Sequence, residues 1–210
     1  MLRATLALIL LLSLPRPAAA QYTPPNRVEQ ALRTGQAFLR AGDRGSAIGW
    51  FRQALQRDPN DPRPYALLGE AYRQRNALDD ARQVLEAGLV RRPESVDLWL
   101  TLARTLRQAG ALDRAAAALR SLMRRAPDHL EALQMRAELA RERGAWAEAL
   151  TVTRRLVSDG EALGLSPEQV NEARRFEPAL RMLARPMDPV SAPRACEGSP
   201  LRRALAGCVP

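Results

Sequence analysis

The chain has 210 residues and a net charge of +9, and all 32 of its basic residues are arginine. This length suits one sizeable domain or an elongated repeat array. The arginines are spread over the whole chain without a dense basic stripe, so nucleic-acid binding is not expected. The absence of lysine has two explanations: selection for planar, bidentate binding of carboxylates or phosphates, or a coding bias toward arginine.

Residues 1–20 are built like an export signal. Arg3 supplies a positive start, an apolar run covers residues 4–14, and small residues at 18–20 offer a cleavage site before Gln21. The run is much shorter than the roughly 20 residues that cross a bilayer. We therefore expect an exported, periplasmic protein with no membrane span after cleavage and a short linker at 21–27. A secreted protein, or one anchored by an uncleaved signal, is the alternative.

A 34-residue frame fits the chain four times after this segment, at 28–61, 62–95, 96–129 and 130–163. Four columns of the frame keep their residue type: one is Ala, one is Gly or Ala, one is Gly or Asn, and one is Pro in three of the units. In that order they are Ala47, Ala81, Ala115 and Ala149; Gly35, Gly69, Ala103 and Ala137; Gly42, Asn76, Gly110 and Gly144; and Pro59, Pro93 and Pro127, with Glu161 in the fourth unit. A period of this length is typical of solenoids.

Each column has a physical cause. Gly or Asn after an apolar-periodic segment ends a helix, because these residues adopt the left-handed conformation that caps the last carbonyls. Two helices per unit follow. The small residues on the first helix and the alanine on the second allow close approach of the two backbones, so the helices are expected to pack as a hairpin. The proline then ends the second helix.

These columns resemble the tetratricopeptide repeat family, a 34-residue helix-turn-helix unit. The second unit matches best, with Tyr65, Leu68-Gly69, Tyr72, Ala81 and Pro93 at the family's preferred places. The fourth unit is degenerate, because Arg136, Ala140 and Thr153 stand at places that are usually apolar or aromatic. The resemblance implies an all-α solenoid of about four helical hairpins.

The C-terminal part continues with one more helix and a tail. Over 164–185, Ser166 can cap a helix, Pro167 suits its first position and Gln169 can complete a capping box. Such a helix would cover the open end of the stack, and Pro178 should kink or interrupt it. The tail at 186–210 is rich in proline.

Cys196 and Cys208 lie in this tail. In an exported protein a disulfide between them is the default. A redox or metal site is the alternative, but the pair lacks the C-x-x-C spacing and supplies only two ligands.

Enzymatic chemistry has little support in this sequence. The chain holds a single histidine, His129, and neither a nucleophile at a suggestive spacing, nor a glycine-rich phosphate loop, nor a metal-binding pattern accompanies it. Asp128, one residue earlier, is expected to cap the next helix. We therefore expect no catalytic residue, no metal and no cofactor.

One set of arginines recurs at the repeat period. We call Arg73, Arg107 and Arg141, near the ends of three first helices, the arginine ladder. The family resemblance places first helices on the concave surface, where the ladder would project into solvent beside other groove residues. These are Arg33, Arg40, Arg104, Leu32, Leu67 and Leu100. The ladder could bind the carboxylates of an acidic peptide or helix, or it could only offset the helix macrodipoles. Interleaved Glu70 and Glu138 favour the second interpretation.

The family also has a carboxylate-clamp subtype, which binds acidic chaperone peptides with Lys and Asn. Here the matching places hold Leu32, Gln36, Leu67, Asp97 and Thr101, so the clamp is absent. The sequence thus predicts a non-enzymatic protein-interaction scaffold of the cell envelope that binds a partner's peptide or helix in the concave groove. The alternative is a structural or accessory subunit of an envelope, secretion or biogenesis complex that docks through its convex face or its tail.

Overall fold

The computed structural model describes residues 27–184, and its regular structure is entirely helical there. The predicted signal at 1–20, nearly all of the linker, and the tail with Cys196 and Cys208 lie outside the described residues. The helices are α2 (Arg27–Arg40), α3 (Arg44–Arg57), α4 (Pro62–Gln74), α5 (Leu78–Arg91), α6 (Val96–Gln108), α7 (Leu112–Met123), α8 (Leu130–Glu142), α9 (Trp146–Ser158) and α10 (Pro167–Leu183).

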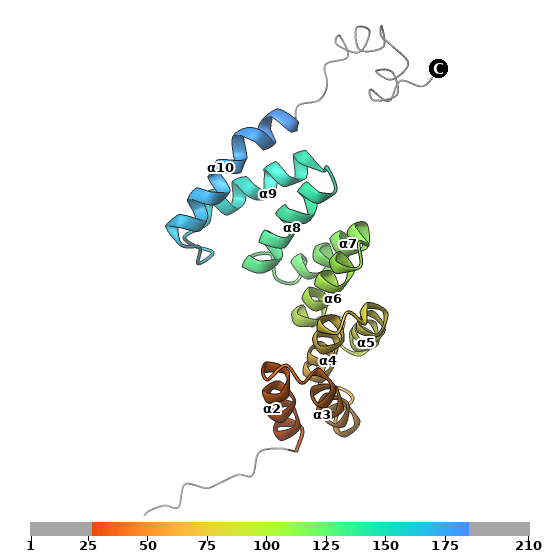
Figure 1. Cartoon of the computed structure of the whole chain (residues 1–210). Helices are drawn as coiled ribbons and strands as arrows, with labels where there is room; N and C mark the ends of the chain where they lie inside the picture. Colours follow the sequence, from red (N-terminus) through yellow and green to blue (C-terminus); the bar gives the residue numbers. More distant parts are fainter. Residues whose placement is uncertain (1–26, 185–210) are drawn as a thin grey trace, which may run out of the picture.

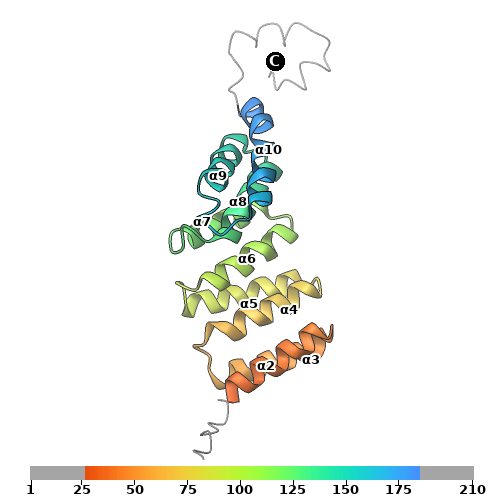
Figure 2. The same ribbon diagram turned by 90° about the vertical axis from the view of Figure 1, so that its left-hand side faces the viewer.

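The helices pair in chain order into hairpins that stack along one direction (Figures 1 and 2). The backbones of two first helices, α4 and α6, lie close together and those of α2 and α4 meet at a few points, whereas the backbones of neighbouring second helices hardly approach one another. First helices therefore form the inner, concave side of the stack. This arrangement confirms the predicted all-α solenoid.

The turns inside the hairpins use the left-handed backbone that the sequence predicted. Gly42, Asn76, Gly110 and Gly144 have φ values of 82°, 60°, 73° and 69°. Asn76 adopts this conformation without being glycine, which Asn tolerates better than most residues. The column of Gly and Asn is thus explained by local backbone geometry.

The small columns permit close contact between the two helices of a hairpin. A Cβ atom added to Gly35 would lie 2.5 Å from the ring of Phe51, and one added to Gly69 would lie 2.6 Å from Leu85. The alanines of the second-helix column, Ala47, Ala81, Ala115 and Ala149, are all fully buried. A larger side chain at these places would force the helices apart.

A polar contact that the sequence did not predict connects successive hairpins. The hydroxyl of Tyr65 donates to the carbonyl oxygen of Pro59 at 3.1 Å. One unit later, Nε1 of Trp99 donates to the carbonyl oxygen of Pro93 at 2.7 Å. An aromatic donor in the first turn of a first helix thus satisfies the carbonyl of the proline that precedes it.

The junction with the fourth hairpin is built differently. Here Arg155 Nη1 from α9 donates to the carbonyl oxygen of Pro127 at 3.1 Å, and Arg155 also pairs with Asp128. The expectation that Asp128 caps α8 is wrong. His129 is the N-cap, and its Nδ1 accepts from the backbone N–H of Ala132 at 3.3 Å. The histidine has a structural contact at the start of this helix.

The helix α10 packs mainly against α9. Its capping box is present as predicted, because Ser166 Oγ accepts from Gln169 N and Gln169 Oε1 accepts from Ser166 N. Val170 and Leu180 are its buried apolar residues. Of the two effects predicted for Pro178, an interruption is wrong, since α10 runs through it to Leu183, and a kink stays a prediction.

Candidate functional site

A cavity of about 350 Å³ lies on the concave side, between α2, α4 and α6. It brings together four of the residues that the sequence proposed for the groove: Leu32, Leu67, Leu100 and Arg104. Each of these three helices therefore contributes one leucine to the floor of the cavity. We call this cavity the groove.

The leucines of the groove floor are largely buried. Leu32 and Leu100 are only 4% and 6% exposed. Leu67 is half-buried, and Ala66 beside it is half-buried as well. The floor can therefore contact an apolar side chain.

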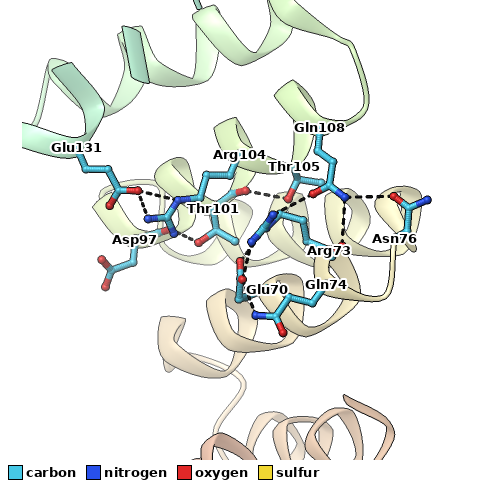
Figure 3. Close-up of polar contacts among 10 residues, drawn as sticks. All are labelled: Glu70, Arg73, Gln74, Asn76, Asp97, Thr101, Arg104, Thr105, Gln108 and Glu131. Carbon is cyan, nitrogen blue, oxygen red and sulfur yellow. Dashed lines mark hydrogen bonds and ion pairs between the residues drawn. The ribbon is translucent and has the colours of Figure 1, made fainter. Parts of the chain in front are cut away.

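The arginine ladder does not project freely into solvent, which corrects that expectation. Arg73 binds the carboxylate of Glu70 through Nε at 2.9 Å and Nη2 at 2.7 Å, and its Nη1 donates to Gln108 Oε1 at 2.9 Å (Figure 3). The hydrogen bonds that Arg73 donates to Glu70 raise the pKa of Arg73 above its usual value. Burial disfavours the charged form of Glu70, but bonds from Arg73 and Gln74 outweigh it and lower the pKa of Glu70.

The second ladder residue is bound by two carboxylates of α8. Arg107 Nε donates to Glu142 Oε1 at 3.0 Å, and Nη1 donates to Glu138 Oε2 at 2.6 Å. Its pKa is raised, first by the hydrogen bond to Glu142. Arg141, the third residue, lies over the ring of Phe176 in α10, with the guanidinium carbon 4.7 Å from the ring centroid.

The three contacts follow one rule. Each ladder arginine reaches a residue of the next helix on the concave side, and these partners stand 34 residues apart: Gln108, Glu142 and Phe176. An amide, a carboxylate and an aromatic face thus occupy equivalent places. The 34-residue spacing of Gln108, Glu142 and Phe176 is visible in the sequence and could have indicated these partners. The ladder joins neighbouring repeats, in addition to any interaction with the helix dipoles.

The other predicted arginines differ in their contacts, and Arg104 lines a further cavity of about 360 Å³ together with Arg73 and Arg107 of the ladder. Arg33 pairs with Glu29 of its own helix at 3.1 Å. Arg104 crosses from α6 to α8, where its Nε donates to Glu131 Oε1 at 2.9 Å (Figure 3). Arg40 is exposed at the end of α2. The structure therefore does not gather the nine predicted residues into one site.

A carboxylate that sequence reasoning did not select as a binding residue also lines the groove. Asp97 is exposed in the first turn of α6, and within the described residues its carboxylate makes no hydrogen bond or ion pair (Figure 3). Its backbone carbonyl accepts from Thr101 Oγ1 at 2.9 Å.

A second cavity, of about 260 Å³, lies between α8, α9 and α10 and includes Arg141 and Phe176. Over residues 27–184 no cluster of three or more His, Cys, Asp or Glu side chains is arranged to hold a metal ion. None of the helices in this range is both long enough and apolar enough for a transmembrane span.

Models of the tetratricopeptide repeat match residues 38–105 and 96–139, which overlap to cover the second and third hairpins and parts of their neighbours. With the hairpin geometry, these matches decide the family. The chain belongs to the tetratricopeptide repeat family. No curated protein sequence matches it.

Solved structures share the fold at low sequence identity. A crystal structure of MamA is 21% identical, covers 66% of this chain and 81% of its own, and has a TM-score of 0.59. The first repeat domain of Spaghetti (RPAP3), bound to the HSP90 peptide SRMEEVD, is 13% identical with a TM-score of 0.53, covering 55% of this chain and 94% of its own. The TPR2B domain of yeast Sti1, in a complex with pHsp70, is 16% identical with a TM-score of 0.52, covering 55% and 98%. At these identities the likeness shows the fold alone.

Proposed function

We propose that this chain is a non-enzymatic protein-interaction scaffold that holds a peptide or helix of a partner in the groove between α2, α4 and α6. The observation that carries the proposal is the groove itself: a cavity of about 350 Å³ with a leucine from each of three repeats on its floor and charged side chains at its edge. Mostly apolar concave surfaces with a few polar groups are the usual form of binding sites.

The structural neighbours support the use of this fold for peptide binding, because the RPAP3 domain is bound to an HSP90 peptide. The ligand itself does not transfer. The clamp positions of this chain hold Leu32, Gln36, Leu67, Asp97 and Thr101 in place of Lys and Asn. We therefore propose peptide binding in the groove for this chain, but not the HSP90 peptide as its ligand.

The test compares two variants that each introduce one arginine, one inside the groove and one on a distant surface. Leu67→Arg places a long charged side chain on the half-buried floor, and Val90→Arg changes a residue of α5 that is 82% exposed and outside the groove. Partners are captured from native extract with both variants at equal folded concentration. Loss of a partner with Leu67→Arg alone supports the groove; equal binding by both variants refutes it.

A structural or accessory subunit remains the second candidate, because apolar side chains are exposed outside the groove. Val90 is 82% exposed, Met182 is 73% exposed and Leu183 is 53% exposed. Single exposed apolar residues are common, but Met182 and Leu183 are neighbours at the end of α10. If Val90→Arg or Met182→Arg abolished partner capture while Leu67→Arg did not, docking through these surfaces would replace the groove.

The proposed setting is the cell envelope, with the protein exported to the periplasm, and it rests on the signal-like segment at 1–20. Mass spectrometry of the native protein should find Gln21 at its N-terminus. An intact Met1 would overturn the cleavage. The same spectrum, taken with and without reduction, tests the proposed disulfide between Cys196 and Cys208.

A further inference from the structure

We propose that the groove selects a partner segment that presents one arginine or lysine beside an apolar side chain, rather than the acidic peptide that an arginine-rich protein suggests. This inference rests on the proposed groove function and names the chemistry of its ligand. The supporting observation is that most charged side chains around the groove already form ion pairs within the chain.

Both arginines that line the groove are engaged with carboxylates of this chain. Arg63 binds Asp61 at 2.7 Å and Glu29 at 3.0 Å. Arg104 binds Glu131 of α8. An incoming carboxylate would lie beside one of these acids as a like charge, whether it displaced that acid or bound a donor that the acid leaves free, such as Nη1 of Arg104. This repulsion offsets part of the attraction to the arginine, so the contact yields less binding energy than an unpaired arginine would give.

The carboxylates that line the groove are three: Glu29, Glu70 and Asp97. Glu29 is held by Arg33 and Arg63, and Glu70 by Arg73 and Gln74. Only the carboxylate of Asp97, among these three, has no hydrogen bond or ion pair within the described residues; in Figure 3 no dashed line reaches it, whereas dashed lines join Glu70 to its partners. The uncompensated charge of the groove is therefore negative.

The simplest alternative role for Asp97 is local, because an acid in the first turn of α6 interacts favourably with the helix macrodipole. That role leaves its carboxylate oxygens free to accept further hydrogen bonds. Asp97 also lines the same cavity as Leu67 and Leu100, which the dipole does not explain. The stem of an arginine or lysine can lie on these leucines while its charged head reaches the carboxylate.

The experiment selects binders from a phage-displayed library of random dodecapeptides on the full-length protein. Selected peptides are synthesised and titrated by fluorescence anisotropy against the original protein and its variants. We expect the peptides to be enriched in arginine or lysine next to leucine, isoleucine or phenylalanine. Asp97→Asn should weaken their binding about three- to tenfold, up to about 1.4 kcal/mol, and added salt should reduce the effect.

The matched control is Asp80→Asn. Asp80 is also an exposed acid in the first turn of a helix, α5, but it does not line the groove. A change that acts only through a helix dipole or through net charge should therefore appear in both variants. Equal weakening by Asp97→Asn and Asp80→Asn would overturn the proposal.

The outcomes separate this inference from the proposed function. Acidic peptides whose binding is lost with Leu67→Arg would overturn the basic ligand and keep the groove. Peptides that bind Leu67→Arg and the original protein equally, or a selection without any binder, would overturn the groove and the inference together. A charge-reversed variant, Asp97→Arg, should shift the selected peptides from basic to acidic if the proposal is right.

Discussion

The α2–α7 stack and the α8–α10 end join their helices in different ways, although the 34-residue frame continues through α8 and α9. The backbones of α4 and α6 lie close together, whereas those of α6 and α8 approach at few points, and α8 turns away from the stack in Figure 1. Between α6 and α8 the side-chain contacts include the ion pairs of Arg104 with Glu131 and of Arg107 with Glu138 and Glu142. The buried residues of α9 and α10 lie in separate clusters around Val152 and Ala149, whereas Ala132, Met135 and Leu139 of α8 belong to the apolar cluster of the stack.

The difference shows that a repeat can keep its turn and its small columns while the chemistry between repeats changes. Gly144 and Ala149 preserve the hairpin of the fourth unit. The partly exposed ion pairs between α6 and α8, however, each stabilise the fold by only about 0–1 kcal/mol. Val170 and Leu180 of α10 supply buried apolar surface at that end. We therefore expect α8–α10 to open locally before α2–α7.

The largest expected effect is the loss of a buried leucine in the stack. Leu85 is fully buried and packs against Gly69. Because Leu85→Ala would leave a cavity there, it should lower the free energy of unfolding by about 2–5 kcal/mol. Leu180→Ala in α10 should instead speed hydrogen exchange chiefly in α8–α10. If exchange in α4 and α5 rose as much with Leu180→Ala, the two regions would be one cooperative unit and the comparison would fail.

Overpacking of a small column should have the next largest effect. Gly35→Ala places a Cβ atom 2.5 Å from Phe51, and we expect a loss of about 1–3 kcal/mol in urea unfolding. Gly49→Ala is the control, since nothing lies within 4 Å of its added Cβ atom. This second change should stabilise α3 by up to about 1 kcal/mol. Similar destabilisation by both would show that close packing at Gly35 is not the cause.

The ladder should contribute less, and mainly between repeats. Arg107→Gln breaks the ion pairs to Glu138 and Glu142, and we expect a loss of about 0.5–1 kcal/mol that high salt reduces. Hydrogen exchange in α8 should rise, while binding of a groove peptide should be nearly unchanged. Severe loss of binding without faster exchange would restore Arg107 as a ligand contact.

The smallest expected effect is the pH dependence of Glu70. Its folded pKa is lowered below 4.5, so its stabilising contribution is complete above this value and is lost as the pH falls through the folded pKa. Glu70→Gln should therefore narrow the stability difference between about pH 7 and about pH 3. Urea unfolding at both pH values measures it; an unchanged difference would show that the pair with Arg73 contributes nothing.

Much of the fold could be predicted from sequence because its determinants are local. Gly42, Asn76, Gly110 and Gly144 need a left-handed backbone, and that requirement appears directly as a residue type. The capping box of Ser166 and Gln169 is equally local. The cap of α8 was misplaced by one residue, because Asp128 and His129 are both able to accept from the helix N-terminus and only the backbone geometry distinguishes them.

The groove was harder to predict because its chemistry depends on contacts between repeats. Spacing placed Arg73, Arg107 and Arg141 on one face, but it did not reveal that each meets a residue of the next helix. Their partners depend on how adjacent hairpins rotate against each other. The same dependence concealed Asp97, whose importance follows from the pairing of its neighbours.

Site-specific photo-cross-linking tests the groove most directly. A photoreactive amino acid replaces Gln36, an exposed residue that lines the groove, or Val90, an exposed residue outside it, and the cells are irradiated with the protein in its native compartment. Our account predicts that Gln36 cross-links to a partner segment containing a basic residue beside an apolar one, and that Leu67→Arg abolishes the product. Cross-linking from Val90 with none from Gln36 would contradict it.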